Sequence, residues 1–562
     1  MKKGEVSKIW LTAQKINKNL IKKFPAINPI ILQILANREI SDFKNFLKTD
    51  FNKGQHNPFL LSDVKKTRDR ILRAQKDKEK ILIFGHFDCD GVCAATLLSE
   101  VLEKLKIKQE VYISERSEGY HINEKLFDQF KNEKISLIIT VDFGITDIRA
   151  GELCQRKGID LVITDHHQPP KKLPKAFAII NPYLSKRYPF KELSGTGVVY
   201  KLISGLINDE KFLKWSLDLV ALATVADVVP LVDENRIFTK YGLIVLKKTR
   251  RLGLCELYKK AGIDRKNINT YTVGFQIAPR LNASGRMDHA LSSYYLLKTK
   301  NKNQAEKIAT KLNELNSKRQ IVLDKSLKEA LDKIKKNKLD KNKMIIVSDK
   351  GWAEGILGLI AGKITEMFSR PSIVLCEDGD FLRGSARSID QFHITNALRE
   401  YEDILERVGG HKKAAGLTIK KKLIKDLYDK LVSFAYQKIS DRDIIPKIKI
   451  DTKIKPSNLT KNFWKNLQIL EPYGYGNPKP VFATHDLMVK NTRPMGDKGK
   501  HLSLNLSDGK NFFRAVGFEM GNLYKIIKPG DKVNIAYNLD LNCWNGNENL
   551  ELRLIDIKKV NI

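Results

Sequence analysis

Short apolar runs that end in acidic or imidazole side chains recur along the first third of the chain. They occupy residues 80–84, 135–141 and 160–164 and are rich in Ile, Leu and Val. Runs of this length and composition are typical of strands that are buried on both faces of a parallel sheet. Helical patterns separate them, as in units that alternate strand and helix. The pattern therefore predicts an α/β domain with a Rossmann-like parallel sheet.

Three potential metal ligands follow the first predicted strand. His86, Asp88 and Asp90 alternate along the chain, so in an extended loop their side chains would share one side. Carboxylates this close repel each other unless a cation lies between them. The segment has neither the GxGxxG pattern nor the lysine of a phosphate-binding loop. It therefore predicts a metal site, with a solvated acidic turn as the alternative.

The other two predicted strands end in similar groups. Asp142 follows the second strand, and Asp165-His166-His167 follows the third. The carboxyl ends of parallel strands meet at one edge of the sheet, which is where open α/β sheets bind ligands. Adjacent side chains on an extended chain point to opposite sides, so we expect one histidine to ligate a metal and the other to face a substrate. Two solvated histidines in a surface turn are the alternative.

A largely apolar helix predicted at 216–229 adds a further carboxylate. Asp227 lies near its C-terminal end, where the helix dipole disfavours a negative charge and a metal ion would compensate. Exposure beyond the helix end is the alternative. The small residues at 194–198 open another predicted helix, and there we favour helix packing over phosphate binding.

Anion binding is predicted by three segments in which small residues let the backbone approach a phosphate. Arg280 and Arg286 flank small residues in a predicted loop. Ser385 and Arg387 alternate in a later segment, which suits an anion on one face. His411 stands in a glycine-rich stretch that is predicted to be a flexible loop. Ordinary turn chemistry is the alternative for any of these segments taken alone.

The pattern divides the chain into five parts. We expect an N-terminal helical arm that packs on the next domain, an α/β domain, a linking helix, a second and smaller α/β domain, and a C-terminal β-barrel. Their expected limits are 1–75, 76–300, 301–342, 343–440 and 446–562. In the last part Asp508-Gly509 is a hairpin signal. Aromatic residues between basic ones there suit the stacking of single-stranded bases, and equally a barrel core.

The net charge of the chain indicates which classes of partner it binds. The 562 residues carry a formal net charge of +35, which favours nucleic acid first and an anionic membrane second. A lysine-rich composition from an AT-biased genome would give the same charge. No uncharged apolar run is long enough to span a bilayer, and no apolar segment of a secretory signal follows the basic N-terminus. The six cysteines form no CxxC pair, so we expect a reducing, cytoplasmic setting without structural disulfides or zinc.

With these residues the chain resembles the DHH phosphoesterase superfamily and, within it, the RecJ single-strand-specific exonucleases. The ordered motifs that carry the resemblance are His86-Phe-Asp88-Cys-Asp90-Gly, Val-Asp142-Phe-Gly, Asp165-His166-His167, Ala-Asp227-Val-Val-Pro, Arg280-Leu-Asn282-Ala-Ser-Gly285-Arg286 and Gly-Gly410-His411-x-x-Ala-Ala-Gly. The resemblance implies a DHH domain, a DHHA1 domain and, from a weaker match, a C-terminal OB-fold.

The resemblance also implies two divalent cations, Mn²⁺ or Mg²⁺, and their surroundings. The expected metal ligands are Asp88, Asp90, Asp142, His166 and Asp227, with Asp142 bridging the two ions. His167, facing the scissile phosphate, and Asp165 complete the expected catalytic group. The expected substrate-binding residues are Arg116, Arg280, Asn282, Arg286, Ser385, Arg387 and His411. The family's first motif usually begins with Asp, and the sequence leaves open whether His86 ligates a metal here.

The expected activity is that of a 5′→3′ exonuclease specific for single-stranded DNA that acts in DNA repair and recombination. Two cations about 3.5–4 Å apart activate a water and stabilise both reacting oxygens, so hydrolysis to 5′-mononucleotides needs no protein nucleophile. The alternatives are a phosphodiesterase of short oligonucleotides or cyclic dinucleotides, and an inactive scaffold that binds single strands. We expect a monomer without membrane association, with a helicase and a single-stranded-DNA-binding protein as candidate partners.

Overall fold

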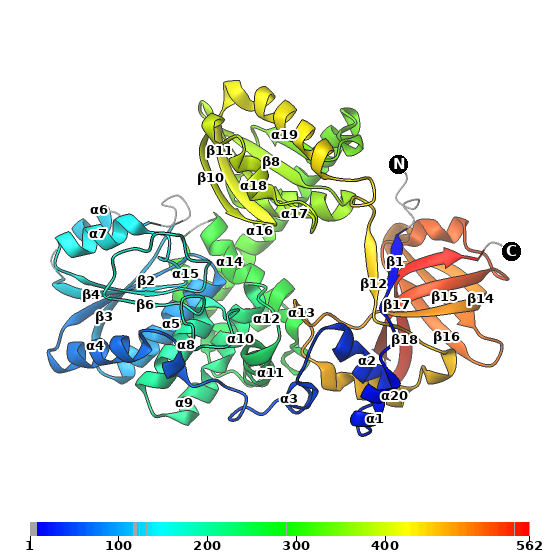
Figure 1. Ribbon diagram of the computed structural model, residues 1–562, viewed down its shortest axis with the longest axis horizontal. Helices are drawn as coiled ribbons and strands as arrows, with labels where there is room; N and C mark the ends of the chain where they lie inside the picture. The colour runs from blue at the N-terminus through cyan, green and yellow to red at the C-terminus, as the bar shows by residue number, and fades with distance from the viewer. Residues whose placement is uncertain are drawn as a thin grey trace. The chain divides into compact units, whose positions relative to one another are not determined.

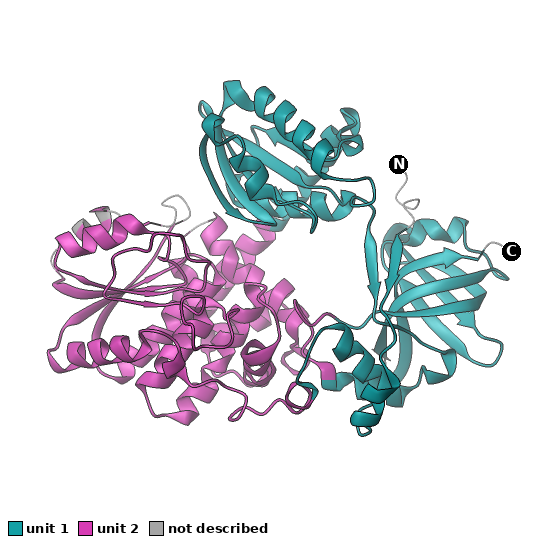
Figure 2. Cartoon of the chain, in the orientation of Figure 1, with its two compact units in different colours: residues 1–43, 320–469, 479–562 teal, residues 44–319, 470–478 magenta. Residues whose placement is uncertain are grey.

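The computed structural model describes residues 8–115, 121–122, 124–130, 133–287, 289–544 and 546–560. The chain forms two compact units, each considered by itself (Figure 2). One unit comprises 44–319 and 470–478, and the other comprises 1–43, 320–469 and 479–562. Helix α16 (Lys302–Lys336) continues from one unit into the other. The sequence predicts a long helix in this stretch.

The first unit is built on a five-stranded sheet in which all neighbouring strands are parallel. Its strands are β2 (Lys80–Gly85), β3 (Lys108–Ile113), β4 (Ile135–Val141), β5 (Asp160–Thr164) and β6 (Ala178–Ile180). Their order is β3-β2-β4-β5-β6. The chain moves from β2 to the edge strand β3 and then returns to β4, so the winding reverses between β2 and β4. The carboxyl ends of these two neighbours form the switch point at which such sheets bind ligands.

Alternating side chains of β2 anchor helices on both faces of this sheet. Ile81 and Ile83 belong to the core formed with α4 (Val64–Lys76), α5 (Cys89–Lys104) and α8 (Gly195–Leu206). Leu82 and Phe84 belong to the core on the other face, with α6 (Glu124–Gln129) and α7 (Ile148–Arg156). Figure 1 shows α6 and α7 on one side of the strands and α4 and α8 on the other. β2 is therefore apolar from Ile81 to Phe84, as the sequence predicts for a strand that is covered on both faces.

Helices make up the remainder of this unit. They are α3 (Phe43–Lys48), α9 (Glu210–Trp215), α10 (Leu217–Ala226), α11 (Asp233–Lys247), α12 (Leu252–Lys260), α13 (Thr270–Thr272), the π-helical turn η4 (Val273–Ile277), α14 (Ala278–Met287) and α15 (Leu291–Lys298). α10 is buried along most of its length and packs against α5 and α8. It thereby brings its C-terminal end towards the sheet edge that carries the candidate ligands.

The second α/β domain contains a mixed sheet of order β10-β11-β9-β8-β7. Its elements are β7 (Ile345–Asp349), α17 (Glu354–Phe368), β8 (Ser372–Asp378), β9 (Phe381–Arg387), α18 (Ile394–Arg399), β10 (Leu405–His411), β11 (Ala414–Lys420) and α19 (Ile424–Lys438). Residues 409–416 were predicted to be a flexible loop, and this is wrong. They form the tip of the β10–β11 hairpin, in which Gly409 pairs with Gly416.

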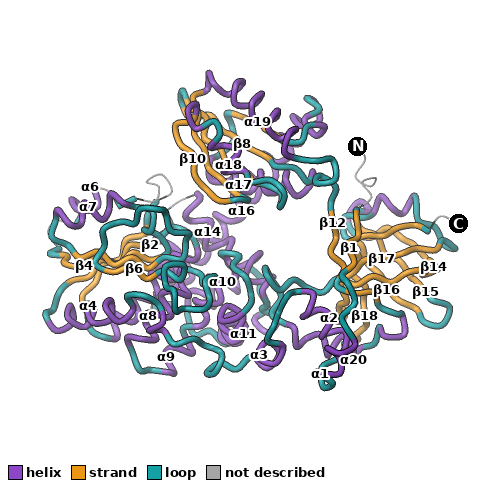
Figure 3. Tube along the Cα trace, in the orientation of Figure 1, coloured by secondary structure: helices purple, strands orange, loops and turns teal. Residues whose placement is uncertain are grey.

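The C-terminal region is a closed barrel. Its strands are β14 (Phe482–Met495), β15 (His501–Ser507), β16 (Phe512–Gly517), β17 (Lys532–Trp544) and β18 (Asn547–Lys559), preceded by β12 (Lys447–Ile450), β13 (Thr452–Lys453) and α20 (Lys461–Leu467). β14 pairs with both β15 and β17, which closes the ring of strands. Figure 3 shows these strands grouped together. The Asp508-Gly509 signal is confirmed, because β15 and β16 are antiparallel neighbours.

The N-terminal segment departs from the predicted arm. Its elements are β1 (Ile9–Thr12), α1 (Lys18–Lys23) and α2 (Pro29–Asn37). β1 pairs in parallel with β12, and the Trp10 indole donates a hydrogen bond of 2.6 Å to Asp556. β1 therefore lies beside the barrel region, whereas α4, the last helix within the bounds of the predicted arm, belongs to the core of the first α/β domain. β1 pairs with backbone groups of β12 that are distant in sequence, so no local pattern could predict this strand.

None of the helices in the described part of the chain combines the length and the apolar character that crossing a membrane requires. The thiols of Cys89, Cys93, Cys154, Cys255 and Cys376 are free.

Candidate metal centre

The segment after β2 is not the extended loop that the sequence predicted. Helix α5 begins at Cys89, and Asp88 caps it by accepting hydrogen bonds from the backbone N–H of Asp90 (3.1 Å) and Gly91 (3.0 Å). A side chain at Gly91 would meet the carbonyl of His86 at 2.4 Å, so glycine lets the helix start this close to the strand. Asp90 thus sits in the first helical turn rather than beside Asp88 on an extended chain. Asp favours the N-cap position of a helix, and this preference ends the extended chain on which residues 86, 88 and 90 were expected to alternate.

The start of α8 holds the carboxylate of Asp90. The backbone N–H of Gly195 and that of Thr196 each donate a hydrogen bond of 2.7 Å to one of its oxygens. The Thr196 hydroxyl also donates to the carbonyl of Asp90 at 2.9 Å. The prediction that 194–198 is no phosphate loop agrees with this arrangement, but sequence reasoning missed that its N–H groups bind a ligand residue. The signal was a small-residue helix start, which has unpaired donors.

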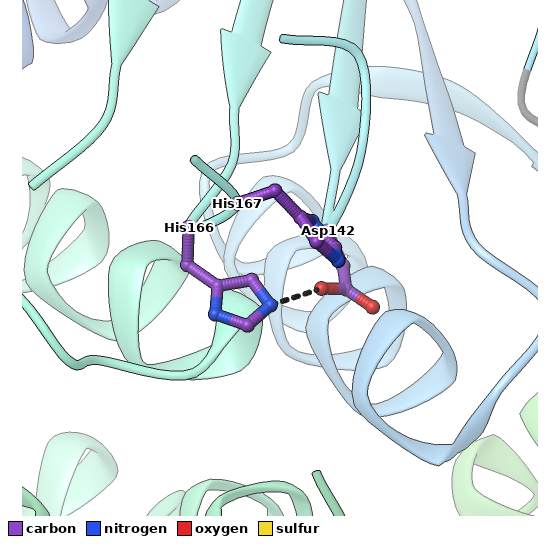
Figure 4. Close-up of side chains that lie close together, drawn as sticks. All are labelled: Asp142, His166 and His167. Atoms are coloured by element: carbon purple, nitrogen blue, oxygen red, sulfur yellow. Dashed lines mark ion pairs between the residues drawn. The ribbon is translucent and has the colours of Figure 1, made fainter. Parts of the chain in front are cut away.

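Asp142 lies in the middle of the site (Figure 4). It is buried directly after β4 with a φ of 66°. Its Oδ1 lies 3.2 Å from His166 Nε2, and its Oδ2 lies 3.6 Å from His86 Nδ1. Each oxygen of one carboxylate therefore faces a different group of potential ligands.

The two adjacent histidines do not point to opposite sides, as the sequence analysis expected. Their ring centroids lie 4.5 Å apart, and both rings lie beside Asp142 (Figure 4). β5 ends at Thr164, so the extended geometry behind that prediction stops before His166. The chain bends here, and a bend lets neighbouring side chains share one side.

Asp165 holds both histidines in position through hydrogen bonds. Its Oδ1 accepts hydrogen bonds from the backbone N–H of His166 (2.7 Å), the backbone N–H of His167 (3.0 Å) and the ring Nδ1 of His167 (2.8 Å). Its Oδ2 accepts one from the backbone N–H of Ile145 at 2.9 Å. Burial alone would raise the pKa of Asp165, but these bonds and the nearby rings lower it to about 2. Asp165 is thus an ionised residue that positions the loop.

Asp227 reaches the site from the end of α10. It is the C-cap of that helix, and its Oδ2 lies 3.6 Å from His166 Nε2. Burial, with Asp142 and Asp88 nearby, raises the pKa of Asp227 to about 7, although His166 opposes the shift. Burial and neighbouring carboxylates also raise the pKa of Asp90 well above its ordinary value. The site gathers more negative charge than its own histidines neutralise.

The donor atoms form three overlapping groups of metal-ligand type. The groups are His86, Asp88 and Asp142; Asp90, His166 and Asp227; and Asp142, His166 and His167, each with ligand atoms within 4.8 Å of one another. Asp142 Oδ1 and His166 Nε2 are buried and form an ion pair at 3.2 Å, but neither makes a hydrogen bond of good geometry, which is costly unless something else occupies them. Carboxylate and imidazole donors suit Mn²⁺ or Mg²⁺. The residues present therefore fit divalent cations, and the geometry includes His86 among them.

A pH-dependent response to metal follows from the raised pKa of Asp227. Between its ordinary value of 3.8 and about 7, the metal-free folded state binds more protons than the unfolded chain, so the free energy of unfolding falls as pH rises. A bound cation removes this penalty. We therefore expect Mn²⁺ to raise the Tm more at about pH 8 than at about pH 5.5, by roughly 3 °C or more.

Thermal scans with and without Mn²⁺ measure this difference. Asp227→Asn should reduce the pH dependence, because its side chain does not titrate, while Asp90, whose pKa is also raised, still contributes. An equal Mn²⁺ effect at both pH values in the unaltered protein would contradict the prediction.

The predicted phosphate loop at 277–286 is also a helix, α14, preceded by the π-helical turn η4. Pro279 lies inside a continuous helical stretch and directly follows the π-helical turn, where the shifted hydrogen-bond pattern accommodates a residue without an N–H. Asn282 Oδ1 accepts a hydrogen bond of 2.7 Å from the backbone N–H of Cys89, so Asn282 anchors the start of α5. The guanidinium of Arg280 donates to the carbonyl of Gln276 (2.6 Å) and to Asn313 (2.9 Å). Arg286 lies in the last turn of the helix.

Three other predicted anion ligands belong to the second α/β domain. Ser385 and Arg387 lie on β9, and His411 ends β10. Burial lowers the pKa of Arg387, whose guanidinium donates to the carbonyl of Ala386 at 3.0 Å. A side chain at Gly358 of α17 would meet Ser385 Oγ at 3.0 Å and Arg387 Nη2 at 3.2 Å. Arg116 lies outside the described residues.

Comparison with known proteins agrees with this architecture. Three family models match: the N-terminal domain of the DHH family at 80–224, the DHHA1 domain at 341–441 and the RecJ OB domain at 450–556. The single-stranded-DNA-specific exonuclease RecJ of Bacillus subtilis is 36% identical over 94% of this chain and 68% of its own length. The Haemophilus influenzae protein of the same name is 28% identical over 94% of this chain and 96% of its own length.

Solved structures show the same likeness. The crystal structure of RecJ from Thermus thermophilus in complex with Mn²⁺ has a TM-score of 0.85 and 26% identity, covering 99% of this chain and 80% of that one. A crystal structure of an exonuclease RecJ bound to manganese has a TM-score of 0.59 and 28% identity, covering 68% of this chain and 98% of that one. The ordered ligands, the three domains and these matches together show that the chain belongs to the RecJ family.

Proposed function

We propose that this protein is a metal-dependent exonuclease that hydrolyses single-stranded DNA from its 5′ end and releases 5′-mononucleotides. The observation that carries the proposal is the convergence of His86, Asp90, Asp142, His166 and Asp227 from separate segments on one switch point. The names and bound metals of the relatives support the same chemistry.

Two divalent cations, Mn²⁺ or Mg²⁺, fit this centre. His86 and Asp88 would hold one, Asp90, His166 and Asp227 would hold the other, and Asp142 would bridge them with one oxygen on each side. When bound, such a pair lowers the pKa of a water and neutralises charge that develops on the phosphoryl oxygens. Asp90 is already oriented by two backbone N–H groups, so little of its conformational freedom is left to lose on binding.

His167 is suited to contact the substrate phosphate. Although burial opposes it, the hydrogen bond between its ring and Asp165 raises the pKa of His167, which favours a proton on the ring. Asp165 holds Nδ1, so the direction of the opposite nitrogen is fixed. We infer that a protonated His167 donates a hydrogen bond to a phosphoryl oxygen, with Asp165 as its positioning residue.

Substrate binding beyond the centre rests on charge. The net charge of +35 favours a polyanion, and Arg280, Ser385, Arg387 and His411 remain predicted phosphate ligands. A cytoplasmic setting, action in DNA repair and recombination, a monomeric state, and a helicase and a single-stranded-DNA-binding protein as partners belong to the same proposal. The barrel and the basic charge favour this function over that of a phosphodiesterase of dinucleotides.

One nuclease assay tests the proposal. Single-stranded DNA labelled at one terminus, a matched strand whose 5′ end is blocked, and a blunt duplex would be incubated with Mn²⁺, with Mg²⁺ and with a chelator. We expect mononucleotides from the open 5′ end of the single strand only, and no product with the chelator. Digestion of the 5′-blocked strand from its 3′ end, or of the blunt duplex, would contradict it. Cleavage confined to dinucleotides would favour the phosphodiesterase alternative.

A further inference from the structure

Two aromatic rings lie stacked on the surface of the first unit. Tyr271 and Phe275 have ring centroids 4.8 Å apart with an interplanar angle of 26°. Their side chains are nevertheless 62% and 70% exposed. Aromatic pairs contribute most to stability when they are buried. A pair that keeps its flat faces in water is better explained by a ligand that covers them.

This pair packs beside the end of helix α10, which carries a candidate metal ligand. A side chain at Gly274, between the two rings in sequence, would lie 3.6 Å from Val225 in the last turn of α10. The C-cap of that helix is Asp227, and the next residue is Val228. Val228 is 62% exposed and has a φ of 59°, which a β-branched residue rarely adopts. Strain of this kind is typical of functional sites.

A fourth exposed apolar residue joins the same surface. Tyr475 is 58% exposed. Its carbonyl accepts a hydrogen bond of 2.7 Å from the backbone N–H of Leu231, and the neighbouring carbonyl of Tyr473 accepts one of 2.6 Å from the Thr270 hydroxyl. The segments that carry Val228, Tyr271 and Tyr475 are thus tied together. We call Val228, Tyr271, Phe275 and Tyr475 the aromatic patch.

Positive charge lies one helical turn from the patch. Arg280 donates to the carbonyl of Gln276, the residue after Phe275, and its other described hydrogen bond also goes to an uncharged oxygen, that of Asn313. Burial and the nearby Arg319 lower the pKa of Arg280. Like charges repel each other, and a phosphate bound at Arg280 would relieve that repulsion. Flat apolar faces beside such a site match the alternating bases and phosphates of a nucleic-acid strand.

We propose that the aromatic patch is a stacking platform for the bases of single-stranded nucleic acid, with Arg280 contacting a phosphate of the same strand. The proposal rests on the function proposed above and adds a specificity-determining surface to it. Bases of a single strand expose their faces, whereas those of a duplex are already stacked and paired. Stacking on Tyr271 and Phe275 therefore favours single strands without reading their sequence. It also fixes the strand at a set distance from the reacting phosphate.

The test combines protein variants with abasic oligonucleotides. The double variant Tyr271→Ala, Phe275→Ala should raise the KM for a single-stranded oligonucleotide by about 5- to 100-fold, the range that stacking of a base supports. An abasic residue near the 5′ end of the substrate should raise the KM of the unaltered protein similarly. In the double variant the abasic residue should have no further effect on the KM, because the rings on which the missing base would stack are absent.

Controls separate stacking from loss of structure. Phe275→Trp keeps a flat ring and should retain the KM, and Tyr295→Ala removes another exposed tyrosine of the same unit and should change nothing. Equal KM values for the double variant and the unaltered protein, or additive effects of variant and abasic residue, would overturn the platform and leave the patch as a surface for a protein partner. If the unaltered protein does not degrade single strands, the proposed function itself fails, which is a distinct result.

Discussion

Replacing Asp142 by asparagine should reduce hydrolysis of single-stranded DNA by at least about a thousandfold. One carboxylate oxygen faces His166 and the other faces His86, and the amide cannot supply negative charge to both sides. Loss of charge stabilisation by metal ions amounts to several kcal/mol in the transition state, and each 1.36 kcal/mol is about tenfold in rate. The measurement is kcat on a 5′-phosphorylated strand, together with Mn²⁺ binding by calorimetry.

The fold should survive this change. Asn has the size of Asp and tolerates the left-handed conformation that Asp142 adopts. Asp486→Asn is a matched control, since Asp486 has a φ of 58° on an exposed part of the barrel, and this variant should keep full activity. Near-normal turnover of Asp142→Asn would refute the bridging role.

The second large loss of activity is expected for Gly195→Ala, although glycine has no functional side chain. In Gly195→Ala the new methyl carbon would lie 2.4 Å from Asp142 Oδ1 and 2.6 Å from Asp142 Cβ. Neither residue can yield easily, because the N–H of Gly195 holds Asp90 and Asp142 is buried. Overpacking of this kind costs about 1–3 kcal/mol of stability. A displacement of about 1 Å at a reacting centre costs about a hundredfold in rate.

Gly197→Ala provides the comparison. It lies in the same first turn of α8, but its added methyl would meet its nearest neighbour, Leu193 Cβ, at 3.4 Å, which is ordinary contact. We expect Gly197→Ala to keep activity within about threefold, a difference below 1 kcal/mol. Comparable losses in both variants would show that α8 tolerates added bulk at neither glycine of its first turn, and would contradict a specific effect of Gly195→Ala on Asp90 and Asp142.

The sheet and the convergence of its ligands could be predicted from sequence for a simple reason. Buried parallel strands leave a continuous apolar run, and each run stops where the chain turns outward at the same edge. By this reasoning Asp142 and His166 were brought to one edge, where their ligand atoms lie together. Asp227 caps a helix, and only the resemblance implied its place beside them. The roles of individual residues, such as the bridging position of Asp142, were implied only by the resemblance to RecJ proteins.

Other parts depend on contacts that no local pattern contains. Gly195 and Asp90 are 105 positions apart, so their hydrogen bond was invisible in the sequence. Residues 277–286 and 409–416 were predicted to be loops because glycine, proline and small residues are frequent in both, yet packing made a helix of one and a hairpin of the other. Propensity is a weak guide once tertiary contacts compete with it.

The pairing of β1 with β12 has a consequence for synthesis of the protein. Ile9 bonds alongside Lys447, so one edge of this ribbon leaves the ribosome long before the other exists. At about 5–20 residues per second, the early edge waits for tens of seconds. During that time its unpaired backbone can bond to other chains. A cell that makes this enzyme has to shield a short nascent segment, and slowing translation between the two edges would lengthen the exposure.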